Sequence, residues 1–157
     1  RRVAGDRHPR RGSADYGAAW NWRIGASSKP AGDPANLAVT FAPSARGLRP
    51  WRPCHARRVT LPSGDIALNW TRRSRAFAGD NWALTEVPLS EMAEGYEIDI
   101  LNGAVVVRTI SDLTTPAFTY TAAMQTADFG ALVSSPLAVR IAQIGALGRG
   151  AILDITL

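Results

Sequence analysis

The sequence predicts an all-β protein, an antiparallel β-sandwich preceded by a short β and loop extension. Two observations carry this prediction. Apolar residues alternate with polar ones along short segments, which is the period of a strand with one buried face. Turn residues separate about seven such segments in the C-terminal two thirds of the chain, a spacing typical of sandwiches. Helical signals are sparse: residues 121–129 fit a turn or two of helix, and fit a loop at one end of the sandwich equally well.

The first 46 residues are expected to form an Arg-rich arm and a short β segment. Residues 1–15 show no periodicity, which indicates a loop. Residues 20–24 and 37–41 alternate, which predicts two strands, and the turn residues of 25–34 join them. Two strands bury little surface alone. We therefore expect this segment to complete a sheet whose other strands lie outside the chain or in a neighbour.

Residues 47–55 are expected to form a Pro-rich linker. Pro50 and Pro53 disfavour a helix and set an extended, semi-rigid path. The sandwich is therefore assigned to residues 56–157.

The strands of the sandwich follow from alternation between turns. Their expected ranges are 56–61, 66–71, 96–100, 105–108, 118–121, 137–142 and 152–157, and residues 82–87 fit a further short extended piece. Residues 62–65 and 148–150 are expected turns. Asn102-Gly103 is the strongest hairpin signal in the chain, because both residues tolerate positive φ.

The charge is unevenly distributed. Residues 1–75 hold 15 Arg and Lys against 4 Asp and Glu, whereas residues 76–157 hold 3 against 9. A basic half can indicate nucleic acid, an acidic surface or an acidic protein neighbour. Lys29 is the single lysine among the 18 basic residues. A GC-rich genome produces such a bias, so we do not count it as a binding signal. We expect an Arg-rich subunit that packs against acidic neighbours, and no nucleic acid as a partner.

Membrane, metal and cofactor signals are not found. No apolar run approaches the roughly 20 residues that span a bilayer, so we expect no membrane insertion, and the first residues turn polar before any apolar stretch forms, which is unlike a signal peptide. Cys54 is the single cysteine, and together with His55 it is too few ligands for zinc. We expect no metal and no cofactor. Residue 1 is not Met, so we expect the chain to be processed or a piece of a longer protein.

Ordered blocks of residues carry a resemblance to a known family. They are 20–23, 32–34, 47–50, 65–75, 79–82, 87–91, 94–98, 120–123, 127–128, 139–144 and 148–150. From about Gly17 onward the chain resembles the C-terminal end of the large host-specificity or baseplate proteins of gene transfer agents and related siphophages of alphaproteobacteria. The resemblance implies a structural component of the tail tip in the virion, with other tail and baseplate proteins as partners. A glycosidase-like TIM barrel belongs to that family. No barrel is present here, so no barrel chemistry is carried over.

A second resemblance concerns the sandwich itself. Residues 137–143 and 148–150 resemble the F strand and the F–G loop of fibronectin type III domains, and Trp70 stands where their B-strand core Trp stands. This implies a fibronectin type III-like sandwich. The Tyr that begins strand F and forms the tyrosine corner would fall near Leu137. We therefore expect the E–F corner to be held by packing or by other hydrogen bonds.

The candidate interaction patch is the most concentrated polar group. It consists of Arg72, Arg73, Arg75, Asp80 and Trp82. The Arg fork and the Trp face suit an acidic glycan or an acidic protein neighbour. The favoured alternative is an internal network in which Asp80 pairs with an Arg. Exposure of the patch would favour a carbohydrate-binding module that recognises host capsule or lipopolysaccharide, and burial would favour assembly.

No catalytic residue is assigned, and we expect the chain not to be an enzyme. The acidic run comprises Glu86, Glu91, Glu94, Glu97 and Asp99. Glu97 and Asp99 alternate with apolar residues, so we expect both on a solvated strand face rather than in a glycosidase cleft. The two histidines lie in the arm and the linker, which leaves no triad. The pair Trp20 and Trp22 would suit stacking on a sugar or a nucleobase, but alternation places both on one strand face, which favours a core or subunit interface.

Overall fold

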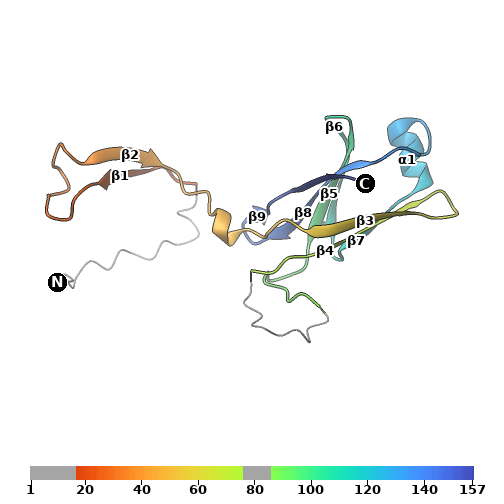
Figure 1. Cartoon of the computed structure of the whole chain (residues 1–157), viewed down its shortest axis with the longest axis horizontal. Coiled ribbons are helices and arrows are strands. Elements are labelled where there is room, and N and C mark those ends of the chain that lie inside the picture. Colours follow the sequence, from red (N-terminus) through yellow and green to blue (C-terminus); the bar gives the residue numbers. More distant parts are fainter. Residues whose placement is uncertain (1–16, 76–85) are drawn as a thin grey trace. The chain divides into compact units, whose positions relative to one another are not determined.

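The computed structural model describes residues 17–75 and 86–157. It divides the chain into two compact units, residues 1–45 and residues 46–157, which Figure 1 shows with their labelled elements.

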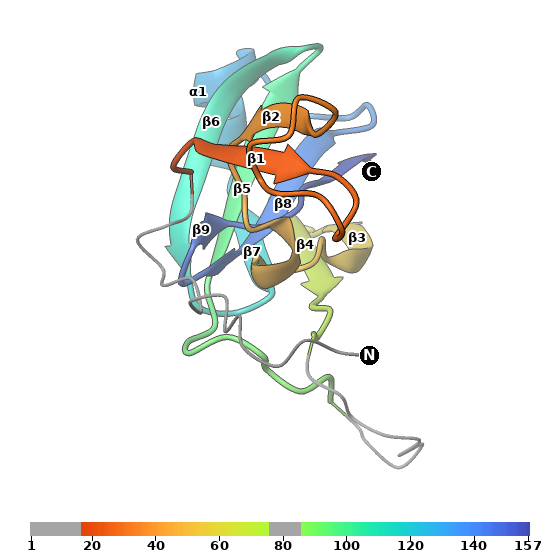
Figure 2. The same ribbon diagram turned by 90° about the vertical axis from the view of Figure 1, so that its left-hand side faces the viewer.

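The first unit contains an antiparallel hairpin of β1 (Trp20–Ile24) and β2 (Leu37–Phe41), as the alternation predicts. Figure 2 shows the two strands and their connecting loop. Asn36 orders that loop, because its side-chain amide donates to the carbonyls of Pro30 and Ala31 at 2.8 and 3.2 Å. The hydrogen-bonded loop therefore helps to set the register between β1 and β2.

The second unit is an all-β antiparallel sandwich, which confirms the predicted fold class. Its strands are β3 (Cys54–Thr60), β4 (Ile66–Thr71), β5 (Tyr96–Asn102), β6 (Val105–Leu113), β7 (Ala117–Tyr120), β8 (Ala138–Gly145), β9 (Gly148–Arg149) and β10 (Leu153–Thr156). One sheet has the order β3-β4-β7 and the other β10-β8-β5-β6, with β9 paired to β8. Read as strands A, B and E against G, F, C and C′, this order is that of a fibronectin type III-like sandwich, a Greek-key relative of the immunoglobulin fold.

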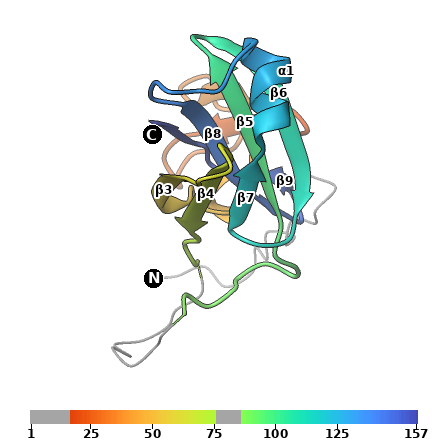
Figure 3. The ribbon, with the colours of Figure 1, turned by 90° about the vertical axis from the view of Figure 1, so that its right-hand side faces the viewer.

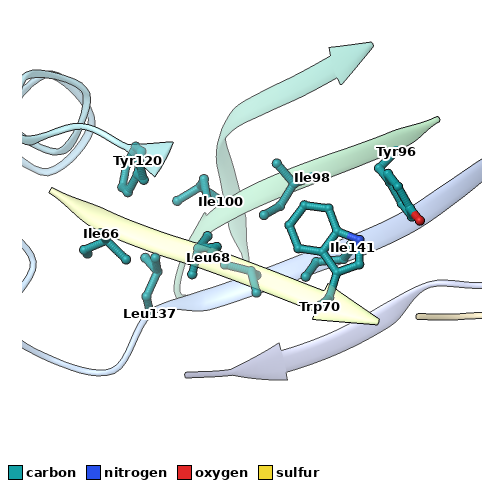
Figure 4. Close-up of a cluster of buried hydrophobic side chains, with 10 residues drawn as sticks. Ile66, Leu68, Trp70, Tyr96, Ile98, Ile100, Tyr120, Leu137 and Ile141 are labelled. Atoms are coloured by element: carbon teal, nitrogen blue, oxygen red, sulfur yellow. The ribbon is translucent and has the colours of Figure 1, made fainter. Parts of the chain in front are cut away.

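The core lies between the inner faces of the two sheets. Trp70 of β4 meets Tyr96 of β5 edge to face, with ring centroids 5.4 Å apart. Figure 4 shows Trp70 beside Tyr96, Ile98 and Ile141 at one end of the cluster, and Tyr120 with Ile66 at the other. The buried cluster comprises Ile66, Leu68, Trp70, Tyr96, Ile98, Ile100, Tyr120, Leu137, Val139 and Ile141. The predicted alternation of β4, β5 and β8 is thus the pattern that fills the core.

A short helix replaces the missing tyrosine corner. Helix α1 (Ala122–Phe129) follows β7 directly and lies at the end of the sandwich shown in Figure 3. Its buried Gln125 donates to the carbonyls of Gly64 and Tyr120 at 2.9 and 3.0 Å, and accepts from the amide of Val133 at 3.0 Å. One amide side chain therefore joins the A–B turn, the end of β7 and the E–F loop, in the region where the tyrosine corner is missing.

Salt-bridged side chains close the same end of the sandwich. Arg108 of β6 donates two hydrogen bonds to the Asp128 carboxylate of α1, at 2.6 and 2.8 Å. The Tyr120 hydroxyl donates to the same carboxylate at 2.6 Å. The bidentate Arg108 contact is the main cause of a lowered pKa at Asp128. Burial is the main cause of a raised pKa at Tyr120, and the neighbouring Asp128 carboxylate adds to it.

Several local expectations need correction. Residues 148 and 149 form strand β9 rather than a turn, because Arg149 pairs with Ile144 across a tight hairpin. Of the expected Asn-Gly pair only Gly103 has a positive φ, at 60°, which suits a type II′ turn. Strand β3 starts at Cys54, earlier than expected, with a bulge between Cys54 and Arg57. The expected extended piece at 82–87 lies mainly outside the described residues, and residues 86–95 contain no strand.

Residues 46–53 pack on the sandwich. The amide of Ala151 donates to the Pro50 carbonyl at 3.0 Å, and Arg49 donates to the Arg149 carbonyl at 3.3 Å. A Cβ added at Gly150 would lie 2.6 Å from the Pro50 oxygen, so the two backbones touch there. The boundaries predicted at residues 46 and 55 stay predictions, but Arg49 and Pro50 fix the segment between them to the F–G hairpin.

Candidate interaction surfaces

Arg72 of the predicted patch is an internal residue of the sandwich. Its guanidinium donates to the Val87 carbonyl at 2.7 Å and to the Glu94 carboxylate at 2.9 Å. The same carboxylate accepts from the Tyr96 hydroxyl at 2.6 Å. Burial is the main cause of a raised pKa at Tyr96, and the Glu94 carboxylate raises it further. Arg72 therefore covers the Trp70–Tyr96 end of the core.

Arg75 is likewise held inside the unit. Its guanidinium pairs with Glu91, whose side chain is only 5% exposed, and also donates to the Gly47 carbonyl at 3.4 Å. Its backbone amide donates to the Ser90 hydroxyl at 3.1 Å. Arg75 thus ties the segment after β4 to the segment before β5 and to the start of the unit.

Arg73 lies at the surface. Its guanidinium stacks over the indole of Trp51 at 5.1 Å from the ring centroid, and Trp51 is 45% exposed. Asp80 and Trp82 lie outside the described residues, so the Asp80 pairing stays a prediction. The partners of Arg72 and Arg75 are glutamates of the acidic run. Sequence reasoning missed Trp51, although its place between two arginine-proline neighbours was a usable signal.

The segment that carries Trp51 is basic, and residues 46–52 together with Arg73 are called the basic edge. Within the residues that the structure describes, seven arginines have no carboxylate within ion-pair distance. They are Arg23, Arg46, Arg49, Arg52, Arg57, Arg58 and Arg73. Four of the seven belong to the basic edge, so uncompensated positive charge collects near an exposed indole.

The acidic run corrects one expectation. Asp99 is buried, with 6% exposure, instead of lying on a solvated face. The guanidinium of Arg149 on β9 covers it at 2.6 Å and also pairs with Glu97 at 2.7 Å, while the Thr109 hydroxyl donates to Asp99 at 2.8 Å. A single guanidinium therefore forms ion pairs with both carboxylates, which engages them in an internal network.

A second surface lies on the hairpin of the first unit. The register places three cross-strand pairs on one face: Trp20 with Phe41, Trp22 with Val39, and Ile24 with Leu37. We call this the hairpin face. Its side chains are substantially exposed, with values of 39% for Trp20, 37% for Trp22, 58% for Ile24, 63% for Leu37 and 56% for Phe41.

The opposite side of the hairpin is polar. Thr40 donates to the side chain of Asn21 at 2.8 Å, and Arg23 pairs in register with Ala38. Large apolar side chains gathered on one face of a strand pair are the pattern of a sheet that packs against another layer. The predicted common face of Trp20 and Trp22 is confirmed, and that face is exposed in this chain.

Metal-binding and membrane-spanning features were sought in the same residues. Across 17–75 and 86–157, no three His, Cys, Asp or Glu side chains gather in a way that could hold a metal ion. Over those same ranges, α1 and the other helical turns are all too short or too polar to cross a membrane.

Comparisons with known proteins yield structural matches alone. No family model matches the chain, and no curated protein matches it. A structure described as a myokine covers 69% of this chain and 95% of its own, at 15% identity and a TM-score of 0.44. The FN5 domain of Drosophila Lar covers 69% and 94%, at 17% identity and 0.39. Domains d3–d4 of rat CD45 cover 100% and 73%, at 11% identity and 0.47.

Proposed function

We propose that this chain is a structural component of a phage or phage-like tail tip or baseplate, where it contributes to assembly. The observation that carries the proposal is the hairpin face, because it presents large apolar side chains that a neighbouring layer must cover. Sandwich folds host many functions and do not support the proposal by themselves. The resemblance of the ordered sequence blocks to tail-tip proteins supplies the kind of assembly.

The size of the exposed face supports an assembly role. Full side chains of this size bury about 150–250 Å² each, so the five exposed fractions amount to about 500 Å² of apolar surface. Patches at the upper end of the range for soluble monomers mark interaction sites. Residues 1–15, which precede β1 in the sequence, contain five arginines and two aspartates, a net positive charge that suits an acidic neighbouring subunit.

Localisation on particles tests the proposal. Antibodies raised against residues 46–157 are applied to particles purified from producing cells, and bound gold is viewed by electron microscopy. We expect gold at the distal end of the tail. Antibody absorbed with the same protein serves as the control. Particles that stay unlabelled while the protein is found free in the cell lysate would overturn the proposal.

A second candidate function is the recognition of an acidic host-surface glycan, such as capsule or lipopolysaccharide. The observation in its favour is the exposed Trp51–Arg73 contact within the basic edge. An indole offers a stacking face for a sugar, and arginine offers a fork for its carboxylate or phosphate. Here the site is Trp51 and Arg73, and not the Arg72 and Arg75 of the predicted patch.

Binding to a purified acidic capsule polysaccharide tests this candidate. We expect Arg73→Ala to weaken retention by about 3- to 10-fold, as loss of a cation–π and charge contact would. Arg140→Ala is the matched control, because Arg140 is paired with Asp154 at 2.8 Å. Equal retention of both variants, or none by the unmodified chain, removes the candidate. Cleavage of the polysaccharide by this chain would overturn its assignment as a non-enzyme.

A further inference from the structure

The hairpin face has a composition that suits contact with a copy of itself. The cross-strand pair at one end is aromatic, Trp20 with Phe41, and the pair at the other end is aliphatic, Ile24 with Leu37. A two-fold axis that lies between the two layers, along the cross-strand direction of the middle pair, lays the aromatic end of one hairpin over the aliphatic end of the other and Trp22 over its own copy. Large side chains then face smaller ones at both ends of the contact, which is the self-complementarity that an isologous interface requires.

The described residues of the hairpin face bring no charge into this contact. No charged residue belongs to the three pairs of the hairpin face. Arg23 lies on the opposite side of the strand. In the connecting loop, Lys29 forms an ion pair with Asp33 at 3.6 Å. As far as residues 17–45 are concerned, two faces of like composition can therefore meet without bringing like charges together.

The area available is sufficient for a specific contact. Each hairpin face offers about 500 Å² of exposed apolar side chain. Two of them remove about 1,000 Å² from water, which reaches the lower limit for biological interfaces. An interface of that size suits a weak dimer with a dissociation constant in the micromolar range or above.

We propose that two copies of this chain associate through their β1–β2 hairpin faces, stacking the two hairpins as opposed layers. The inference rests on the proposed assembly role of that face, and it names the occupant as a second copy. It places the paired region in the first unit.

Sedimentation equilibrium of the 157-residue chain tests the inference. Over about 1 to 500 µM, we expect the mass to rise from 16.8 kDa toward twice that value. Leu37→Asp places a carboxylate in the contact, and we expect the dissociation constant to rise by about 30-fold or more. Ala38→Asp makes the same change one residue later, on the opposite face, and we expect it to associate as the unmodified chain does.

Two further readouts keep the test decisive. Both variants place Asp in the same strand, so loss of association in Leu37→Asp alone cannot come from weakened strand propensity. Tryptophan emission of the unmodified chain should shift to the blue as concentration rises, because Trp20 and Trp22 leave water. Raising the salt concentration should leave the association intact, whereas a contact made by the basic residues would weaken.

The outcomes separate this inference from the proposed function. A chain that stays monomeric throughout, or a dimer that Leu37→Asp leaves unchanged, overturns the second-copy inference. If gold still labels the tail tip in that case, the assembly role stands and a different subunit covers the hairpin face. If particles are unlabelled but the dimer forms, the tail-tip proposal fails and the self-association stands.

Discussion

The two units of this chain use the same alternating pattern and reach opposite outcomes. In β4, the alternate residues Ile66, Leu68 and Trp70 are at most 4% exposed, because a second sheet lies across them. In β1, the alternate residues Trp20, Trp22 and Ile24 are 37–58% exposed. Alternation thus specifies a strand and its apolar face in both units. What covers that face depends on how many strands the unit contains.

The difference indicates where each unit obtains its stability. The two sheets of the sandwich bury each other's inner faces. Polar side chains add hydrogen bonds at both ends, such as those of Gln125 at one end and Arg72 at the other. The hairpin has an ordered turn and a register, and among the described residues 17–45 its two strands form a two-stranded sheet. We therefore expect the sandwich to fold by itself and the hairpin to gain its full stability from a contact outside its own unit.

A matched pair of leucines tests this difference with the largest effect. Leu68→Ala leaves a cavity in the core and should lower the free energy of unfolding by about 2–5 kcal/mol. Leu37→Ala removes an exposed side chain, and at micromolar concentration it should change that free energy by about 0.5 kcal/mol or less. Urea denaturation followed by circular dichroism measures both. Similar losses in the two variants would contradict the contrast between the units.

Two buried glutamines give the next effect. Gln125→Leu leaves the carbonyls of Gly64 and Tyr120 and the amide of Val133 without this hydrogen-bond partner. We therefore expect the free energy of unfolding to fall by about 2–4 kcal/mol. Gln143 is also buried, but its amide atoms have no hydrogen-bond partner in the part of the chain that the structure describes. Gln143→Leu should therefore be neutral or stabilising by about 1 kcal/mol. A greater loss at 143 than at 125 would remove Gln125 as the substitute for the tyrosine corner.

Much of the sandwich was predictable because its signals are local. The alternation of β4 and β5 and the Asn102-Gly103 hairpin are read within a few residues. The burial of Asp99 was not predictable, because the guanidinium that covers it comes from Arg149, 50 residues later. The role of Gln125 was not predictable for the same reason, since its partner Gly64 is 61 residues away in the sequence.

The candidate patch was predictable only as a concentration of arginines. Sequence proximity groups Arg72, Arg73 and Arg75, but neighbouring residues of an extended segment point to different sides. Arg75 and Arg72 bind glutamates that lie 16 and 22 residues later in the sequence, whereas Arg73 stacks on Trp51. The surface with exposed aromatic and basic groups therefore lies on residues 46–52 and 73, which no local pattern joins.

Glycine substitutions test whether residues 46–53 are part of the sandwich unit. Gly150→Ala would place a Cβ 2.6 Å from the backbone oxygen of Pro50 and 2.9 Å from that of Gln143. One backbone must move, so we expect the free energy of unfolding, measured by thermal denaturation, to fall by about 1–3 kcal/mol. Gly47→Ala, with no atom within 4 Å of the added Cβ, should change stability by about 0.5 kcal/mol or less. No loss at 150 would mean that residues 46–53 are not fixed to the F–G hairpin.

The smallest expected effect is a pH dependence of the sandwich. The pKa of Asp128 is lowered, chiefly by its hydrogen bonds with Arg108, from an ordinary value of 3.8. The folded state therefore binds this proton less readily than the unfolded state, and the stabilisation is present above about pH 4 and is lost as pH falls through the lowered pKa. Asp128→Asn should cost about 1–2 kcal/mol at pH 7, after allowance for the partly exposed Arg108, and less at pH 2. Equal losses at both pH values, in urea titrations, would contradict the linkage.

Hydrogen exchange read by mass spectrometry tests the central contrast most directly. Peptides covering β4 and β8 should be protected at every protein concentration, because the sandwich closes its own core. Peptides covering β1 and β2 should exchange fast at low concentration and become protected as the chain associates. Hairpin peptides that are equally protected at the lowest concentration, or fast at all concentrations, would contradict the account that the hairpin face is completed by a second copy.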